Sequence, residues 1–301
     1  MELIPIDAHI TGIDHNLIAR PGVGMVFVVQ GDDVAIIETG ASPTVPETLA
    51  GLEQMGIARD AVRHILCTHV HMDHAGGAGF LAEALPNAMV YINSMTGPHL
   101  VDPSRLIPSV ERAVGPEAWP YHGTVQPLDP ARLLPAENLH LDLGQGVILE
   151  AVSTPGHSPD HIAYWDRKSG GMFIGDGASV SMPRLKLTFP VAPPPTYNRD
   201  EHLATVARLR QLDISRFYIT HFGVYEDVAG LLEITETKIA ELYDLVCAAL
   251  DNEQIDVPAL SRQWLPYDPA DPDSLIARSW GEMSVNGMLR YERKRRERAA
   301  A

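Results

Sequence analysis

The stretch 68–77 places three histidines and an aspartate within six residues. A short apolar run precedes it and two glycines follow it, a pattern typical of a loop after a buried strand. Side chains two positions apart in an extended segment lie on the same side, so His69 and His71 can converge on one point. Asp73 and His74 lie beyond the bend and can face a second point. Imidazole and carboxylate groups in this spacing predict a site for zinc or a neighbouring transition metal.

The composition indicates an ordinary globular protein and narrows the kinds of partner. The 301 residues are 45% hydrophobic and 21% charged, which is enough to bury a core. The net charge of −16 disfavours nucleic acid and an anionic membrane surface as partners, because phosphate binding needs a basic face. The two cysteines, Cys67 and Cys247, fit a reducing compartment. Since no signal-peptide pattern and no apolar run near the ~20 residues of a membrane span are present, we expect a cytoplasmic protein.

Apolar runs separated by turn residues predict several strands with helices between them. This arrangement occurs twice in the chain, over 1–92 and again over 139–225. This layout suggests two sheets packed face to face with helices outside. The proline-rich segments 93–136 and 181–199 are expected to form pocket walls together with the C-terminal helices, with a plain surface excursion as the alternative for the first. The charge run 292–298 is expected to be a solvated, frayed end. Strands are expected at 25–29, 34–37, 63–67, 89–92, 139–143, 147–152, 161–165, 171–174 and 217–220, and helices at 45–55, 76–85, 104–114, 199–212, 227–250 and 284–290.

Three further segments place a histidine or an aspartate directly after an apolar strand. They carry His157 in Thr-Pro-Gly-His, Asp176 in Gly-Asp-Gly, and His221 in Thr-His-Phe-Gly. Gly156 would allow a tight backbone turn before the first of them. Together with the stretch 68–77 they give seven candidate ligands, whereas one catalytic zinc takes about three protein ligands and a water. Seven ligands suit two ions about 3.5–4 Å apart, with the aspartate shared.

The ordered motifs resemble the metallo-β-lactamase-fold hydrolase superfamily, and within it the glyoxalase II-like and lactonase-like branches. The resemblance covers about residues 20–225. It implies an α+β fold, a four-layer αβ/βα sandwich, in which 1–225 form the catalytic domain and 226–301 a helical C-terminal extension packed on it. One departure is Glu38 in Glu-Thr-Gly, where members often have aspartate, an acid expected behind the ligands. The resemblance also implies the ligand sets, namely His69, His71 and His157 for the first metal, Asp73, His74 and His221 for the second, and Asp176 as the bridge.

These features predict a dinuclear metal-dependent hydrolase that cleaves an ester, thioester or lactone of a small molecule by attack of a metal-bridging hydroxide. Two divalent ions per chain are expected, zinc first and iron or manganese as alternatives, and Asp73 is the expected catalytic residue. One alternative is a mononuclear iron persulfide dioxygenase, with its iron on His69, His157 and Asp176. A phosphodiesterase is a further alternative, although the acidic charge disfavours it. From another class, the chain could be a metal-dependent binding or sensor module.

The remaining polar residues carry weaker predictions. Arg184, Lys186 and Tyr197 are candidate contacts for a substrate carboxylate or oxyanion, with surface exposure as the alternative. His161 is expected to be a hydrogen-bonded structural histidine rather than an eighth ligand. The long helix expected after residue 226 offers a surface on which a homodimer could form. The other histidines are expected to be solvated, capping or structural, namely His9, His15, His64, His99, His122, His140 and His202.

Overall fold

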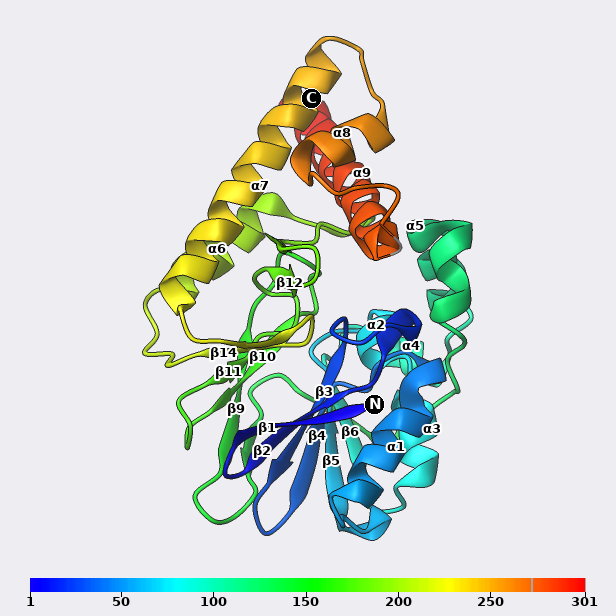
Figure 1. Cartoon of the computed structure of the whole chain (residues 1–301), viewed down its shortest axis with the longest axis vertical. Helices are drawn as coiled ribbons and strands as arrows, with labels where there is room; N and C mark the ends of the chain where they lie inside the picture. Colours follow the sequence, from blue (N-terminus) through cyan, green and yellow to red (C-terminus); the bar gives the residue numbers. More distant parts are fainter. Residues whose placement is uncertain (272, 301) are drawn as a thin grey trace.

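The computed structural model describes residues 1–271 and 273–300 and shows two large sheets packed face to face (Figure 1). The first sheet has the order β1-β2-β3-β4-β5-β6-β7 and the second has the order β15-β14-β11-β10-β9-β8. The first contains β1 (Glu2–Asp7), β2 (Ile10–Asp14), β3 (Met25–Gln30), β4 (Val34–Ile37), β5 (Val62–Leu66), β6 (Met89–Ile92) and β7 (Leu133–Pro135). The second contains β8 (His140–Asp142), β9 (Ile148–Ser153), β10 (Ile162–Asp166), β11 (Met172–Phe173), β14 (Phe217–Ile219) and β15 (Gly223–Tyr225).

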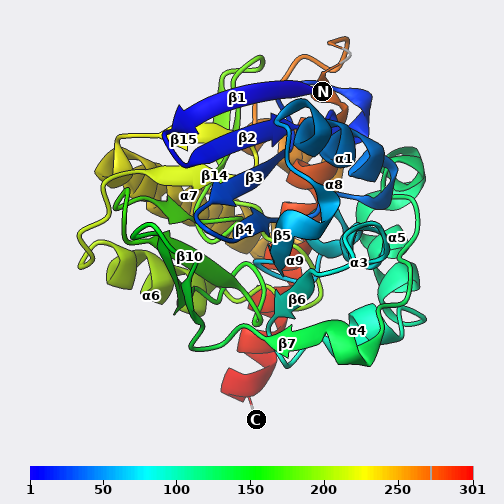
Figure 2. The ribbon, with the colours of Figure 1, turned by 90° about the horizontal axis from the view of Figure 1, so that it is seen from below.

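Helices cover the outer faces of both sheets, and a small hairpin, β12 (Val180–Met182) with β13 (Leu187–Phe189), stands apart from them. Figure 2 shows α1 and α3 on one side of the sheets and α6 and α7 on the other. None of the described helices is both long and apolar enough to cross a membrane. The helices are α1 (Val45–Gln54), α2 (Met72–Ala75), α3 (Ala78–Ala84), α4 (Pro98–Val101), α5 (Leu106–Ala118), α6 (Arg199–Leu209), α7 (Val228–Asp251), α8 (Val257–Trp264) and α9 (Ser274–Ala300).

The alternation of side chains along the strands produces the layers. In β3, Phe27 and Val29 pack between the two sheets, while Val26 and Val28 pack under α1 and α3. The ring of Phe27 meets that of Phe173 from the second sheet at 5.1 Å between centroids. Both faces of these strands are therefore buried, which explains their nearly continuous apolar sequence. The predicted four-layer α+β sandwich is confirmed.

The C-terminal helices α7, α8 and α9 gather at one end of the sandwich around a separate apolar cluster (Figure 1). The prediction that residues 292–298 form a frayed end was wrong, because α9 continues through this charge run without interruption. Glu292 accounts for this order. Its fully buried carboxylate accepts hydrogen bonds from Arg295 and Arg296 and from the hydroxyl of Tyr243. These hydrogen bonds, led by that of Arg295, lower the pKa of Glu292 to about 2, so the charge remains paired inside the helical cluster.

Candidate metal centre

The seven predicted ligand residues lie together at one edge of the sandwich, on four loops that each follow a strand. The loop after β5 runs extended and then turns into the short helix α2, and it carries four of the seven. The loops after β9, β11 and β14 carry one each. Three groups of these side chains bring their donor atoms within 4.8 Å of one another, and the groups are His69, His71 and His157; His69, His74 and Asp176; and Asp73, His74 and His221.

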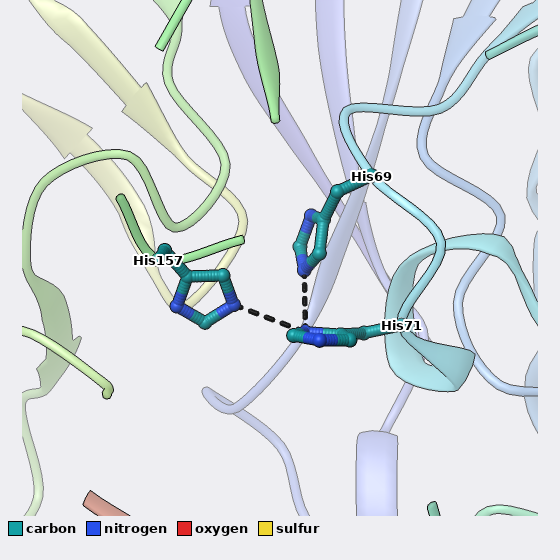
Figure 3. A group of neighbouring side chains, drawn as sticks. All are labelled: His69, His71 and His157. Atoms are coloured by element: carbon teal, nitrogen blue, oxygen red, sulfur yellow. Dashed lines mark hydrogen bonds between the residues drawn. The ribbon is translucent and has the colours of Figure 1, made fainter. Parts of the chain in front are cut away.

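The first trio consists of His69, His71 and His157, whose rings point toward one another (Figure 3). The Nδ1 atom of His71 lies 2.8 Å from Nε2 of His69 and 3.0 Å from Nε2 of His157. His69 and His157 are buried, and His71 is partly exposed. Three ring nitrogens that face one point from two separate loops form a donor set suited to a transition metal.

The second trio consists of Asp73, His74 and His221. The Nε2 atom of His221 lies 3.1 Å from Nε2 of His74 and 3.6 Å from Oδ2 of Asp73. Asp176 lies between the trios, because its Oδ2 atom is 3.5 Å from Nε2 of His157 and 3.6 Å from Nε2 of His74. Its Oδ1 atom is 3.8 Å from Nε2 of His221. One carboxylate therefore faces both donor sets.

The outer nitrogens of these histidines are held by hydrogen bonds that fix the ring orientation. His157 donates from Nδ1 to the carbonyl oxygen of Val191 at 2.9 Å, and His221 donates from Nδ1 to that of Val23 at 2.7 Å. Because Nδ1 carries the proton in each ring, the lone pair of Nε2 faces the centre. Such outer hydrogen bonds commonly orient the imidazoles that bind metals.

Glu38 holds ligand residues of both trios. Its fully buried carboxylate accepts a hydrogen bond from Nδ1 of His74 at 2.9 Å and another from the hydroxyl of Thr68 at 2.7 Å. That hydroxyl lies 2.9 Å from Nδ1 of His69 and accepts its proton. The backbone N–H of Thr68 and the hydroxyl of Thr220 also donate to Glu38, each at 3.2 Å. Glu38, the acid expected behind the ligands, therefore connects the loop after β5 of the first sheet with the loop after β14 of the second.

Charge at this edge favours cations. Burial lowers the pKa of His69 and of His157 well below the ordinary value, which leaves both rings neutral with a lone pair available. For His74 burial acts in the same direction, but the carboxylates around it, led by Glu38 and Asp176, outweigh burial and hold its pKa well above the ordinary value. A positive charge at this point is therefore stabilised by the surrounding carboxylates.

Asp176 provides the clearest sign that the residues fit metal ions. Although burial opposes it, the neighbouring His74 and His157 hold the pKa of Asp176 well below its usual range, so the carboxylate is charged. Its Oδ1 atom is buried and has no hydrogen-bond partner in the described part of the chain. A buried charged oxygen without a partner is costly unless a cation meets it. The residues therefore fit metal ions in three respects: the types of their donor atoms, the grouping of those atoms, and this unpaired oxygen.

A cavity of about 330 Å³ opens beside the centre. It is lined by four of the seven residues, namely His71, Asp73, His157 and Asp176. Its walls come from α5, from residues 191–196 and from Trp280 and Met283 of α9. The prediction that 93–136, 181–199 and the C-terminal helices supply the pocket walls is therefore confirmed.

Comparison with known proteins decides the family. A sequence model of the metallo-beta-lactamase superfamily matches residues 19–221, which is more than half of the chain and includes all seven residues. The chain belongs to the metallo-beta-lactamase superfamily. The crystal structure of an archaeal metallo-beta-lactamase superfamily protein from Sulfolobus tokodaii matches with a TM-score of 0.71 and 21% identity, covering 94% of this chain and 99% of that chain. This likeness shows a shared fold.

The curated relatives of this superfamily member are distant. The uncharacterized protein YobT of Bacillus subtilis is 26% identical over 194 residues, which cover 62% of this chain and 77% of YobT. A protein named thioesterase pkgB, from Emericella nidulans, is 26% identical over 156 residues, covering 49% of this chain. The aligned part spans only 36% of pkgB.

The three substrate-contact candidates lie away from the cavity of this superfamily member. Arg184 and Lys186 are exposed near the tip of the β12–β13 hairpin, and Nε of Arg184 donates to Asp273 at 2.7 Å. Tyr197 is buried against His202, with 5.8 Å between ring centroids. None of the three lines this cavity, and Arg184 and Lys186 are surface residues, the alternative given for them. Tyr197 instead lines a second cavity that adjoins the first.

Several residues that are not candidate ligands also shape the metallo-beta-lactamase centre. His122 donates from Nδ1 to the carbonyl oxygen of Ala118, the last residue of α5, at 3.1 Å, which agrees with the capping role expected for it. It is also buried and lines the cavity, which was not predicted. Asp160 accepts hydrogen bonds from the N–H of Val70 at 3.0 Å and from the hydroxyl of Thr96 at 2.7 Å, and thereby holds the loop after β5. His161 is a buried, hydrogen-bonded structural residue as predicted, with Nδ1 2.7 Å from the hydroxyl of Thr154.

Replacing Gly156 with alanine should both destabilise the fold and displace His157. Gly156 has φ of +136°, and a Cβ atom there would lie 2.3 Å from Cα of His202. We expect a loss of roughly 3 kcal/mol or more in the free energy of unfolding, because backbone atoms cannot move aside easily. Chemical unfolding and metal content measure the two effects.

Gly146→Ala is the matched control for that variant. Gly146 also has positive φ, +77°, but a Cβ atom there would have no described atom within 4 Å. It should cost only about 1–2 kcal/mol through backbone strain, and metal content should not change. Equal losses in the two variants would show that crowding against His202 is unimportant.

Proposed function

We propose that this protein is a dinuclear metal-dependent hydrolase that cleaves an ester, thioester or lactone of a small molecule. The observation that carries the proposal is the arrangement of seven donor side chains as two trios on either side of Asp176. Three protein donors with a position left for water form the usual pattern of a catalytic zinc. Two such ions, when bound, lower the pKa of a water molecule and polarise the substrate carbonyl.

In this proposal His69, His71 and His157 hold the first ion, Asp73, His74 and His221 hold the second, and Asp176 serves both. Zinc suits the mixture of imidazole and carboxylate donors. The second trio supports two ions over a single iron on His69, His157 and Asp176, because a single iron would leave Asp73 and His221 without a metal.

Asp73 is the proposed catalytic residue. Although burial opposes it, the neighbouring histidines, led by His74, lower the pKa of Asp73, so its carboxylate is ionised and can accept a proton. Asp73 also lines the cavity in which the substrate would lie. It can take the proton of the attacking water and return it to the departing oxygen or sulfur.

The walls of the cavity support an acyl substrate. Leu106, Val110 and Val114 of α5 line the cavity together with Val191 and the proline run 193–195. Such a pocket suits an apolar acyl body whose carbonyl reaches the carboxylates and histidines at the centre. The name of the relative pkgB, a thioesterase, favours thioesters among the three substrate classes.

Metal analysis of the purified protein, followed by assays on esters, thioesters and lactones, tests the proposal. We expect two zinc ions per chain, and we expect His69→Ala and His221→Ala each to lower the metal content and abolish turnover. One iron per chain with oxygen uptake would instead indicate a dioxygenase. Two bound metals without hydrolysis of any substrate would indicate a binding module.

A further inference from the structure

A second cavity, of about 460 Å³, adjoins the one at the metal centre. Pro159, Pro195 and Thr196 line both cavities, so the two cavities meet at these residues. A molecule with its carbonyl at the centre can therefore extend over Pro195 into the second cavity. We call this second cavity the α9 groove, since one of its walls is a face of that helix.

The helical wall of the groove is strongly basic. The residues of α9 that line the groove are Arg290, Tyr291, Lys294, Arg295 and Arg298, which recur at spacings of three and four and so share one face. The chain as a whole carries a net charge of −16, with only 23 lysines and arginines. Four of these cations on one wall of one groove reverse the charge of the protein locally, a pattern that attracts anions.

Most of these cations have no carboxylate partner. Arg295 pairs with the buried Glu292, and Nε of Arg290 donates to the carbonyl oxygen of Pro195 at 3.2 Å. In the part of the chain that the structure describes, Lys294 and Arg298 form no ion pair. Their side chains are exposed at the groove and available to a ligand.

Two acids also line the groove, Asp200 and Glu201 of α6. Asp200 is paired with Arg199 at 3.4 Å. Asp200 and Arg295 are each paired with a residue that does not line the groove. Among the remaining residues that line it, three cations face one carboxylate, that of Glu201, and the cations are Arg290, Lys294 and Arg298. The balance in the groove is positive and favours a ligand with more than one negative charge, because arginine and lysine together supply several donors for phosphate oxygens.

We propose that the α9 groove binds the phosphate of a thioester substrate whose thiol arm is phosphorylated, as in coenzyme A or 4′-phosphopantetheine. The proposal rests on the proposed hydrolase function. The acyl body occupies the apolar cavity, the carbonyl lies at the metal centre, and the polar arm passes over Pro195 to Lys294 and Arg298. Hydrolysis adds water across the C–S bond, giving a carboxylic acid and the free phosphorylated thiol.

A matched pair of substrates tests the proposal on the metal-loaded full chain. Butyryl-coenzyme A and butyryl-N-acetylcysteamine present the same thioester with and without phosphate. We expect KM to be at least tenfold lower for the coenzyme A thioester, with similar kcat. Lys294→Glu and Arg298→Glu should each raise KM for that substrate about five- to tenfold and leave the truncated substrate unaffected.

Arg293→Glu is the control for both variants, since Arg293 lies on the same helix, undergoes the same charge reversal and does not line the groove. It should change KM less than twofold. If Arg293→Glu acted like Lys294→Glu, the effect would come from general charge and the proposal would be wrong. Equal KM values for the two substrates in the unmodified protein would also overturn it.

Binding measured without turnover gives a separate readout. In titration calorimetry we expect coenzyme A and 4′-phosphopantetheine to bind more tightly than unphosphorylated pantetheine, and more weakly as salt increases. Tight binding of both phosphorylated thiols would locate recognition in the 4′-phosphate, whereas tight binding of coenzyme A alone would locate it in the nucleotide phosphates. Equal affinity for all three thiols would contradict the proposal.

The two proposals fail in different ways. If neither thioester is hydrolysed and no other ester or lactone is, the hydrolase function fails. If butyryl-N-acetylcysteamine and the coenzyme A thioester are hydrolysed with equal KM, the hydrolase function stands and only the proposal for the phosphate groove fails.

Discussion

Replacing Asp176 with asparagine is expected to reduce the metal content from two ions to one or none and to lower kcat by about a thousandfold or more. The amide keeps the shape of the side chain but removes the charge that faces both trios. In the native side chain, Oδ2 lies within 3.6 Å of Nε2 of both His157 and His74. A neutral amide is a poor ligand, so neither ion would keep its shared donor. Metal analysis and turnover of a thioester measure the loss.

Asp213→Asn is the control for this variant, because it makes the same chemical change at an exposed residue between α6 and β14. It should leave both the metal content and kcat unchanged. Full turnover by Asp176→Asn with two ions retained would rule out the shared role proposed for this carboxylate.

Replacing Glu38 with glutamine is expected to weaken metal affinity about 10- to 100-fold and to lower activity by a similar factor, without removing any metal ligand. One of the two carboxylate oxygens becomes an NH₂ group. If it replaces Oε2, it meets the N–H of Thr68 donor to donor; if it replaces Oε1, it opposes His74 and the hydroxyls of Thr68 and Thr220. The orientation of the histidines in both trios is thereby loosened.

The same variant should lower the free energy of unfolding by about 1–3 kcal/mol, because a buried donor is left without an acceptor. A metal titration measures the affinity and chemical denaturation measures the stability. Glu233→Gln, on the exposed side of α7, provides the same change without a buried network and should alter neither quantity. Unchanged metal affinity in Glu38→Gln would mean that ligand orientation does not depend on this carboxylate.

The sequence allowed prediction of the sandwich and of which side chains meet at its edge, because both depend on local patterns. Buried strands appear as short apolar runs, and the ligand residues follow those runs directly, as at β5 and β14. The two sheets then bring these strand ends to one edge. The positions of His157 and His221 beside the stretch 68–77 therefore follow from strand order rather than from any long-range signal in the sequence.

Features that depend on contacts between distant segments were not predictable in the same way. The helical order of the charge run in α9 requires the buried Glu292 and its partner Tyr243, which lies 49 positions earlier. His122 lines the cavity only because α5 folds back beside the centre. Arg184 pairs with Asp273, 89 positions further along the chain, and so lies on the surface, which was one of the two alternatives given for it.

The cavity walls and the ligand loops have separate origins in the chain. The seven donors stand on the ends of sheet strands, whereas α5, the proline run 193–195 and α9 form the walls. A change of side chain on these walls need not disturb a donor atom, except at Trp280 of α9, whose ring packs 4.7 Å from that of His221. This separation should make the protein a good starting point for laboratory selection, since libraries confined to α5 could change which acyl groups enter while the reactive edge stays intact.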